Sequence, residues 1–167
     1  MRSFRIALLL IGLAGSSAIL VAVRTSHRGA EDVAKPTRSL VGVTVRDAQH
    51  DVRALAPAGG GAVLVISATC PHCRATLGQL ASGAAGASLA HLQIVTPEGT
   101  ELGARLLDSL GIHAALSEPL DRQAFMRRLK LSSTPSLLYA NADGSVRATI
   151  VGELSKAEIA TLVSSLH

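Results

Sequence analysis

Aromatic residues are nearly absent from this sequence. It has no Trp, one Tyr and two Phe, and aromatic side chains make up 2% of its 167 residues. Beyond the N-terminal segment the aromatics are Phe125 and Tyr139 alone. Apolar residues still make up 48% of the chain, so a folded core must be built mainly from Leu, Val, Ile and Ala.

A widespread excess of one charge is absent too. The formal net charge is +4, but Arg2, Arg5 and Arg24 lie in or beside the first apolar run. Of the 16 basic residues these three leave 13, against 12 acidic ones. The basic cluster at residues 127–130 is interpreted as a solvated helix face. No basic stripe is interleaved with aromatics, which argues against nucleic-acid binding.

The first 30 residues contain no acidic residue, and residues 6–23 contain no charge at all. As a helix these 18 residues would span about 27 Å, close to the hydrocarbon thickness of a bilayer. They are either a membrane anchor or a signal peptide. Ser16 and Ala18 would suit a cleavage site by type, but a strongly apolar stretch follows them, so an uncleaved anchor is favoured over secretion after cleavage.

Residues 1–24 are thus assigned to the anchor or signal segment, and residues 25–39, which are polar and aperiodic, to a linker. Residues 40–167 form the domain. Arginines flank the apolar run on both sides, so they do not fix its orientation. With the short N-terminal head inside, the expected arrangement is a single-pass protein of the cytoplasmic membrane whose domain faces the periplasm or cell exterior.

The domain alternates between strand and helix signals, which predicts an α/β fold with a mixed central sheet and helices on both faces. The run at residues 62–67 reads as a central strand buried on both sides. Ser155 followed by Glu158 predicts a capping box for the last helix. Strands are expected at residues 40–45, 51–55, 62–67, 91–96, 135–140 and 145–152, and helices at residues 74–85, 100–111, 121–131 and 155–166.

Cysteine is scarce: the two cysteines, Cys70 and Cys73, are separated by Pro71 and His72 and directly follow the predicted central strand. A disulfide between them would close a very short loop, which contributes little as a crosslink. The spacing therefore favours a reversible redox pair over a structural staple.

The residue types support thiolate chemistry at Cys70. The N-terminus of a helix has unpaired N–H groups and a partial positive charge, both of which favour an anion. The first cysteine of a Cys-x-x-Cys motif can have a pKa as low as roughly 3.5–7.5. Pro71 suits a first helical turn, and His72 could donate a hydrogen bond or positive charge to the Cys70 sulfur. Cys73, one turn along, would resolve a mixed disulfide.

Two other interpretations remain open at this point. A zinc site usually needs four ligands and a second Cys-x-x-Cys is absent, although the cysteines with one of the six histidines could bind copper. The cysteines could also be inert core residues, but their position at a strand–helix junction would then be accidental.

The stretches "VLVISATCPHC" and "KLSSTPSLLYANADGSVRATIVG" resemble the thioredoxin superfamily, and more closely its membrane-anchored, extracytoplasmic TlpA- and ResA-like members. The resemblance covers about residues 40–167 and implies a thioredoxin fold. It also implies that Pro135 follows a cis peptide bond beside the cysteines and that Thr134 offers backbone pairing to a substrate peptide. The Cys-Pro-His-Cys motif resembles that of DsbA.

Three positions depart from the family pattern. Thr69 stands where thioredoxins usually have Trp, Leu64 where they often have a buried acid, and Thr76 where cytochrome-maturation reductases commonly have Glu. These departures argue against a dedicated haem-pathway reductase.

The resemblance and the residues together predict an extracytoplasmic thiol:disulfide oxidoreductase that acts on protein clients as oxidant or isomerase. Cys70 and Cys73 would be catalytic, with no metal or organic cofactor, and a membrane redox partner would renew the pair. The alternatives are a reductase in the maturation of cytochrome c or another metalloprotein, and a non-enzymatic factor that delivers a metal or assists assembly.

Overall fold

The computed structural model describes residues 38–55, 59–83, 89 and 91–166. The predicted anchor at residues 6–23 and almost all of the linker lie outside the described residues. Within the described ranges, no helix has the length and apolar character needed to cross a bilayer.

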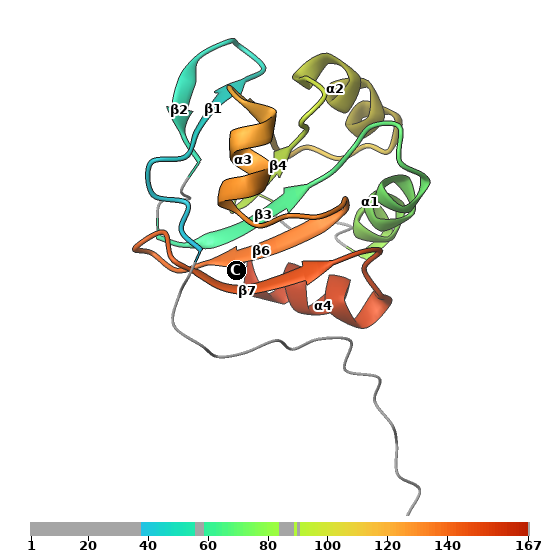
Figure 1. Cartoon of the computed structure of the whole chain (residues 1–167). Helices are drawn as coiled ribbons and strands as arrows, with labels where there is room; N and C mark the ends of the chain where they lie inside the picture. Colours follow the sequence, from blue (N-terminus) through green and yellow to red (C-terminus); the bar gives the residue numbers. More distant parts are fainter. Residues whose placement is uncertain (1–37, 56–58, 84–88, 90, 167) are drawn as a thin grey trace, which may run out of the picture.

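The described residues form one mixed seven-stranded sheet with four helices (Figure 1). The strands lie in the order β2-β1-β5-β4-β3-β6-β7. The elements are β1 (Thr44–Asp47), β2 (Val52–Ala54), β3 (Gly61–Val65), α1 (Pro71–Gly83), β4 (Leu92–Val95), α2 (Thr100–Ser109), β5 (Ala115–Pro119), α3 (Arg122–Arg128), β6 (Ser136–Ala140), β7 (Val146–Val151) and α4 (Lys156–Ser165).

The connections determine which strands run parallel. Helices α1 and α2 connect β3 to β4 and β4 to β5, and both strand pairs are parallel. The hairpin β6–β7 adds antiparallel strands beside β3, and the hairpin β1–β2 does so beside β5. The central position of β3 brings the segment after its carboxyl end to the middle of one edge of the sheet.

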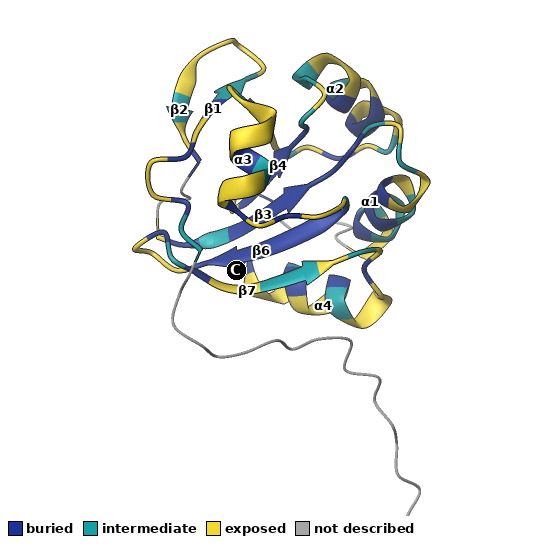
Figure 2. Cartoon of the chain, in the orientation of Figure 1, coloured by how far each residue is buried: buried dark blue, intermediate teal, exposed yellow. Residues whose placement is uncertain are grey.

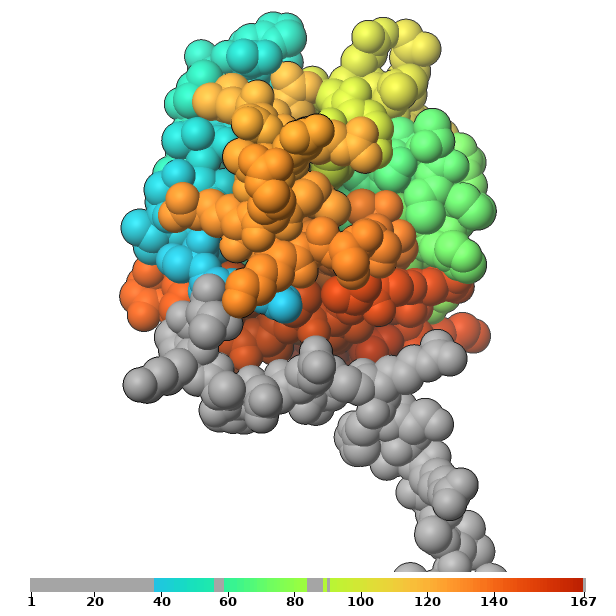
Figure 3. Space-filling view, viewed as in Figure 1, coloured from blue at the N-terminus to red at the C-terminus, as the bar shows by residue number. Residues whose placement is uncertain are grey.

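Alternating side chains of β3 build two apolar cores. Ala62 and Leu64 belong to the cluster that includes residues of α1, α2 and α4, whereas Val63 and Val65 belong to the cluster that includes α3. All four are fully buried, as predicted for a central strand, and each large aliphatic side chain buried in this way stabilises the fold by roughly 1.5–3 kcal/mol (Figure 2). In Figure 3, atoms of α3 cover the middle of the face in view.

The sequence prediction was right in the main, although α3 ends three residues and β3 two residues earlier than predicted. Three further errors concern α1, β1 and β5. Helices lie on both faces of a mixed sheet, and Ser155 and Glu158 form the predicted capping box. The helix α1 begins at Pro71, three residues earlier than expected. The first strand begins at Thr44 and not at residue 40, because a turn closed by Val43 N–H on the Leu40 carbonyl precedes it.

The third error is β5, which was not predicted. Its sequence, Ala-Leu-Ser-Glu-Pro, contains no β-branched residue and ends in proline. It is a strand because β4 pairs with it on one side and β1 on the other. Tertiary pairing here overrides weak local propensity.

Candidate active site

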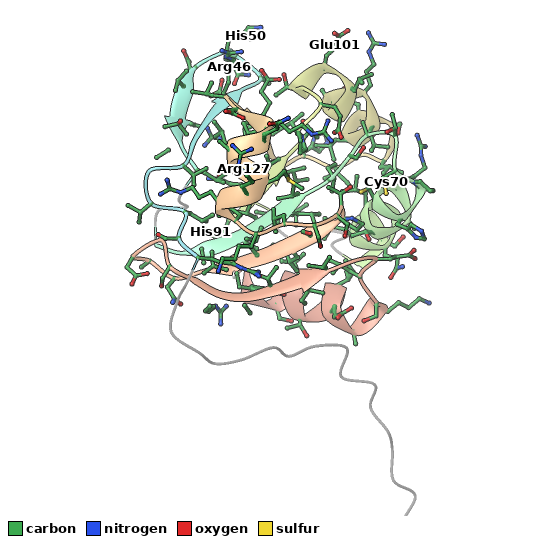
Figure 4. The ribbon with its side chains drawn as sticks, in the orientation of Figure 1. Arg46, His50, Cys70, His91, Glu101 and Arg127 are labelled. Atoms are coloured by element: carbon green, nitrogen blue, oxygen red, sulfur yellow. The ribbon has the colours of Figure 1, made fainter. Side chains whose placement is uncertain are left out.

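Cys70 lies immediately before α1, at the end of a turn that follows β3 (Figure 4). Its N–H donates to the Ser67 carbonyl at 3.2 Å, and its own carbonyl accepts from Arg74 N–H at 3.1 Å. Pro71, which has no N–H to leave unpaired, is the first residue of the helix. This geometry leaves the N–H groups of His72 and Cys73 free of intrahelical partners beside the Cys70 sulfur.

The two thiols occupy different environments. Cys70 is partly exposed, whereas Cys73 is fully buried in the core formed with α4 and β3. The Cys73 Sγ accepts a hydrogen bond from Ser67 N–H at 3.3 Å. Both cysteines are present as free thiols, so the structure corresponds to the reduced pair.

These environments move the two pKa values in opposite directions. Burial alone would raise the pKa of Cys70, but hydrogen bonds from the backbone and thiol of Cys73 and from the backbone of His72 outweigh it and lower that pKa below its usual 9.0. Burial raises the pKa of Cys73 to about 11, in spite of the hydrogen bond from Ser67. Cys70 therefore forms a thiolate more readily than Cys73, and the thiolate is the reactive form of a cysteine.

The loop before β6 approaches Cys70 from the other side. The Thr134–Pro135 peptide bond is cis, as the family resemblance implied. The Cys70 thiol donates to the Thr134 carbonyl with an Sγ–O distance of 3.7 Å. Thr134 is half-buried and Pro135 is buried. The structure thus brings together Cys70, Cys73, Thr134 and Pro135.

The side chain of His72 contacts Glu153 and not, as the sequence had suggested, Cys70. Its imidazole Nδ1 is 2.8 Å from Oε2 of Glu153, in the turn between β7 and α4, and the ring is exposed. No contact between this ring and Cys70 is found among the described residues. The backbone of His72, by contrast, does contribute to lowering the Cys70 pKa. Sequence reasoning missed Glu153 altogether.

The positions where relatives carry acids are filled by other side chains. Leu64 is fully buried in the core. Thr76 is also fully buried, and its Oγ1 accepts a hydrogen bond from Leu154 N–H at 3.2 Å. Among the described residues the buried polar side chains are Ser67, Thr76, Thr96, Ser117 and Ser136, so no carboxylate lies buried beside Cys73.

Within the part of the chain that the structure describes, the cysteines do not belong to a metal-binding cluster. In residues 38–55, 59–83, 89 and 91–166, no three His, Cys, Asp or Glu side chains gather closely enough to hold a metal ion. A hollow of about 360 Å³ lies at the other end of β3, where Gly61 and His91 are among its lining residues. Cys70, by contrast, is partly exposed.

The overall fold of the chain has many counterparts among solved structures. A secreted Mycobacterium tuberculosis disulfide oxidoreductase homologous to Escherichia coli DsbE is 14% identical, with a TM-score of 0.56, and the match covers 72% of this chain and 93% of that one. Bacillus subtilis StoA is 12% identical, covers 71% and 93% of the two chains, and gives a TM-score of 0.54. The chain has a thioredoxin-like fold.

A third thioredoxin-like structure, a thio-disulfide isomerase from Thermus thermophilus, is 15% identical, with a TM-score of 0.59 and coverage of 78% of this chain and 94% of that one. No protein-family model and no curated protein sequence matches the chain. At these identities the similarity concerns the thioredoxin-like fold, and the chemistry must be argued from the chain's own residues.

Proposed function

We propose that this protein is a thiol:disulfide oxidoreductase that exchanges a Cys70–Cys73 disulfide with protein clients. The observation that carries the proposal is the contrast between the two thiols: Cys70 is accessible with a lowered pKa, and Cys73 is buried with a pKa of about 11. Cys70 attacks or is attacked, and Cys73 resolves. The disulfide itself accepts the two electrons, and the reduced pair holds them, so the reaction needs no metal or organic cofactor.

In the oxidising direction a client thiolate attacks Sγ of Cys70 in the disulfide form. The Cys70–Cys73 bond breaks, and Cys73 leaves with the electron pair and takes up a proton. A second client thiolate then attacks the client sulfur of the mixed disulfide and releases Cys70 as a thiolate. The client loses two electrons and gains a disulfide, and the cysteine pair ends reduced.

Two features support the role of oxidant or isomerase. Hydrogen bonds that stabilise the Cys70 thiolate stabilise the reduced pair, which makes its disulfide a stronger oxidant. The reverse reaction requires Cys73 to lose its proton, and no carboxylate is buried beside it among the described residues. The stabilised thiolate favours accepting electrons from clients, and the missing carboxylate slows deprotonation of Cys73 when the pair delivers them.

The clients would be extended protein segments. Cys70 is partly exposed, and its thiol contacts the backbone carbonyl of Thr134, in the loop that leads to Pro135. A client strand that pairs with this loop would place its own cysteine next to Cys70. Main-chain pairing of this kind accepts many sequences, which suits an enzyme with several clients.

The cellular setting in this proposal follows from residues 6–23, whose length and apolar character suit a single-pass anchor in the cytoplasmic membrane. The domain at residues 40–167 would face the periplasm or exterior, with residues 25–39 as the linker. A redox partner in the membrane would return the pair to its oxidised form.

Trapping of mixed disulfides tests the proposal. Cys73→Ser should accumulate client adducts on Cys70, because resolution is lost, and mass spectrometry of reduced eluates identifies the clients. Cys70→Ser is the matched control and should trap nothing. Adducts on Cys73 in the control, or none in either variant, would contradict the proposal.

A further inference from the structure

Glu153 contacts the active-site helix from the far end of the sequence. Its Oε2 lies 2.8 Å from Nδ1 of His72, which is 81 residues earlier in the chain. The two side chains are 40% and 68% exposed, so solvent weakens the pair without abolishing it. Neither the motif nor the cysteine chemistry described above accounts for this contact.

The backbone on both sides of Glu153 is fixed to the active site. Gly152 N–H donates to the Pro135 carbonyl at 2.8 Å, and Leu154 N–H donates to Thr76 Oγ1 at 3.2 Å. Leu154 is itself buried in the core. Three consecutive residues thus contact, in turn, the cis-proline loop, the His72 ring and the body of α1. The Glu153 carboxylate is presented to His72 from a rigid support.

The contact between Glu153 and His72 determines whether the imidazole can stabilise the Cys70 thiolate. His72 is the second residue of α1 and comes two positions after Cys70, and a hydrogen bond from its backbone N–H lowers the Cys70 pKa. With Nδ1 bound to a carboxylate, the ring faces Glu153 and its positive charge, when protonated, is balanced. His72 then stabilises the thiolate through its backbone alone, beside the contributions from the backbone and thiol of Cys73.

We propose that Glu153 is a positioning residue that holds the His72 imidazole away from Cys70 and so limits the stabilisation of the Cys70 thiolate. This inference rests on the proposed function, since a less stabilised thiolate makes the disulfide a weaker oxidant. Glu153 thereby sets how oxidising the pair is, although it touches neither sulfur.

Four variants distinguish a positioning role of Glu153 from a direct effect of its charge on Cys70. They are Glu153→Gln, His72→Ala, the double variant, and Glu101→Gln as a matched control. Glu101 pairs with Arg105 on α2, so its replacement removes the same charge at a different place. The readouts are the equilibrium constant with glutathione buffers and the absorbance of the Cys70 thiolate against pH.

Glu153→Gln should lower the Cys70 pKa and shift the glutathione equilibrium toward the reduced protein by about two- to fivefold, the range of an exposed ion pair. The double variant should match His72→Ala, because Glu153 acts only through the imidazole. Glu101→Gln should match the wild type.

No shift in Glu153→Gln would overturn the inference. So would an equal shift in the His72→Ala background, which would mean that the carboxylate acts on the sulfur by its own charge. If no variant exchanges with glutathione, the proposed function fails, and the absorbance titration still decides by the same comparison whether Glu153 acts through His72.

Discussion

The Sγ atom of Cys70 lies 3.7 Å from the carbonyl oxygen of Thr134, which comes 64 residues later in the chain. Cys70 follows the central strand β3, and Thr134 precedes β6, the antiparallel neighbour of β3. Pairing of these strands places thiol and carbonyl at the same edge of the sheet. A client that enters this edge would meet the nucleophile and a backbone acceptor together.

The first prediction concerns the order of reactivity. With the pair reduced near neutral pH, limiting iodoacetamide should alkylate Cys70 and spare Cys73, because Cys70 has the lower pKa and the greater exposure. Peptide mapping by mass spectrometry gives the ratio. Urea-unfolded protein is the control, and there the two cysteines should react alike. Preferential labelling of Cys73 in the folded protein would refute the assignment.

The second prediction concerns stability against pH for the reduced protein. Cys70 has a lower pKa in the folded protein than in the unfolded protein. It therefore adds stability that is fully present above the unfolded-state pKa and is lost as the pH falls through the folded-state pKa. The raised pKa of Cys73 acts the other way: above about pH 9 the unfolded thiol ionises while the folded one stays protonated until about pH 11.

The free energy of unfolding of the reduced protein, relative to the oxidised protein, should therefore rise toward pH 9 and fall between about pH 9 and 11. Urea unfolding of both forms across this range measures it. The oxidised protein lacks both thiols and serves as the reference. A difference that does not vary with pH would show that the two thiols do not differ in the way described.

A third prediction concerns Gly152, which has φ of +102° and donates its N–H to Pro135. An added Cβ meets no atom within 4 Å, so Gly152→Ala should strain the backbone without a clash. A loss of about 1 kcal/mol of stability is expected, together with slower exchange with a client peptide.

Gly111→Ala provides the matched control. Gly111 has φ of +65° and an equally open Cβ position, but it follows α2, away from the cysteines. Its stability should fall by a similar amount while its exchange rate stays at the wild-type level. Equal loss of exchange in both variants would mean that Gly152 matters only for folding.

The sequence predicted those parts of the molecule that depend on local pattern. The continuous apolar run at residues 62–67 could only be a buried strand or a short helix segment, and its length decided between them. Ser155 with Glu158 marked the last helix through a capping box, which is a local hydrogen-bond pattern. The position of Cys70 at a strand–helix junction followed from the same signals.

Contacts between distant residues could not be predicted in the same way. β5 is a strand through its two neighbours, and the partner of His72 is an acid 81 residues away with no motif around it. The Cys-Pro-His-Cys motif suggested that the imidazole would face Cys70, because the motif by itself contains no other partner for His72. The turn that brings Glu153 to His72 depends on how β7 and α4 pack against α1, which no local signal encodes.

The redox potential of the Cys70–Cys73 pair tests the central claim most directly. Equilibration with glutathione buffers at neutral pH, followed by counting of free thiols, gives its value. An oxidant or isomerase with a stabilised Cys70 thiolate and a protonated, buried Cys73 should have a potential clearly less negative than the roughly −270 mV of thioredoxin. A potential at or below that value would contradict the account and would indicate a reductase.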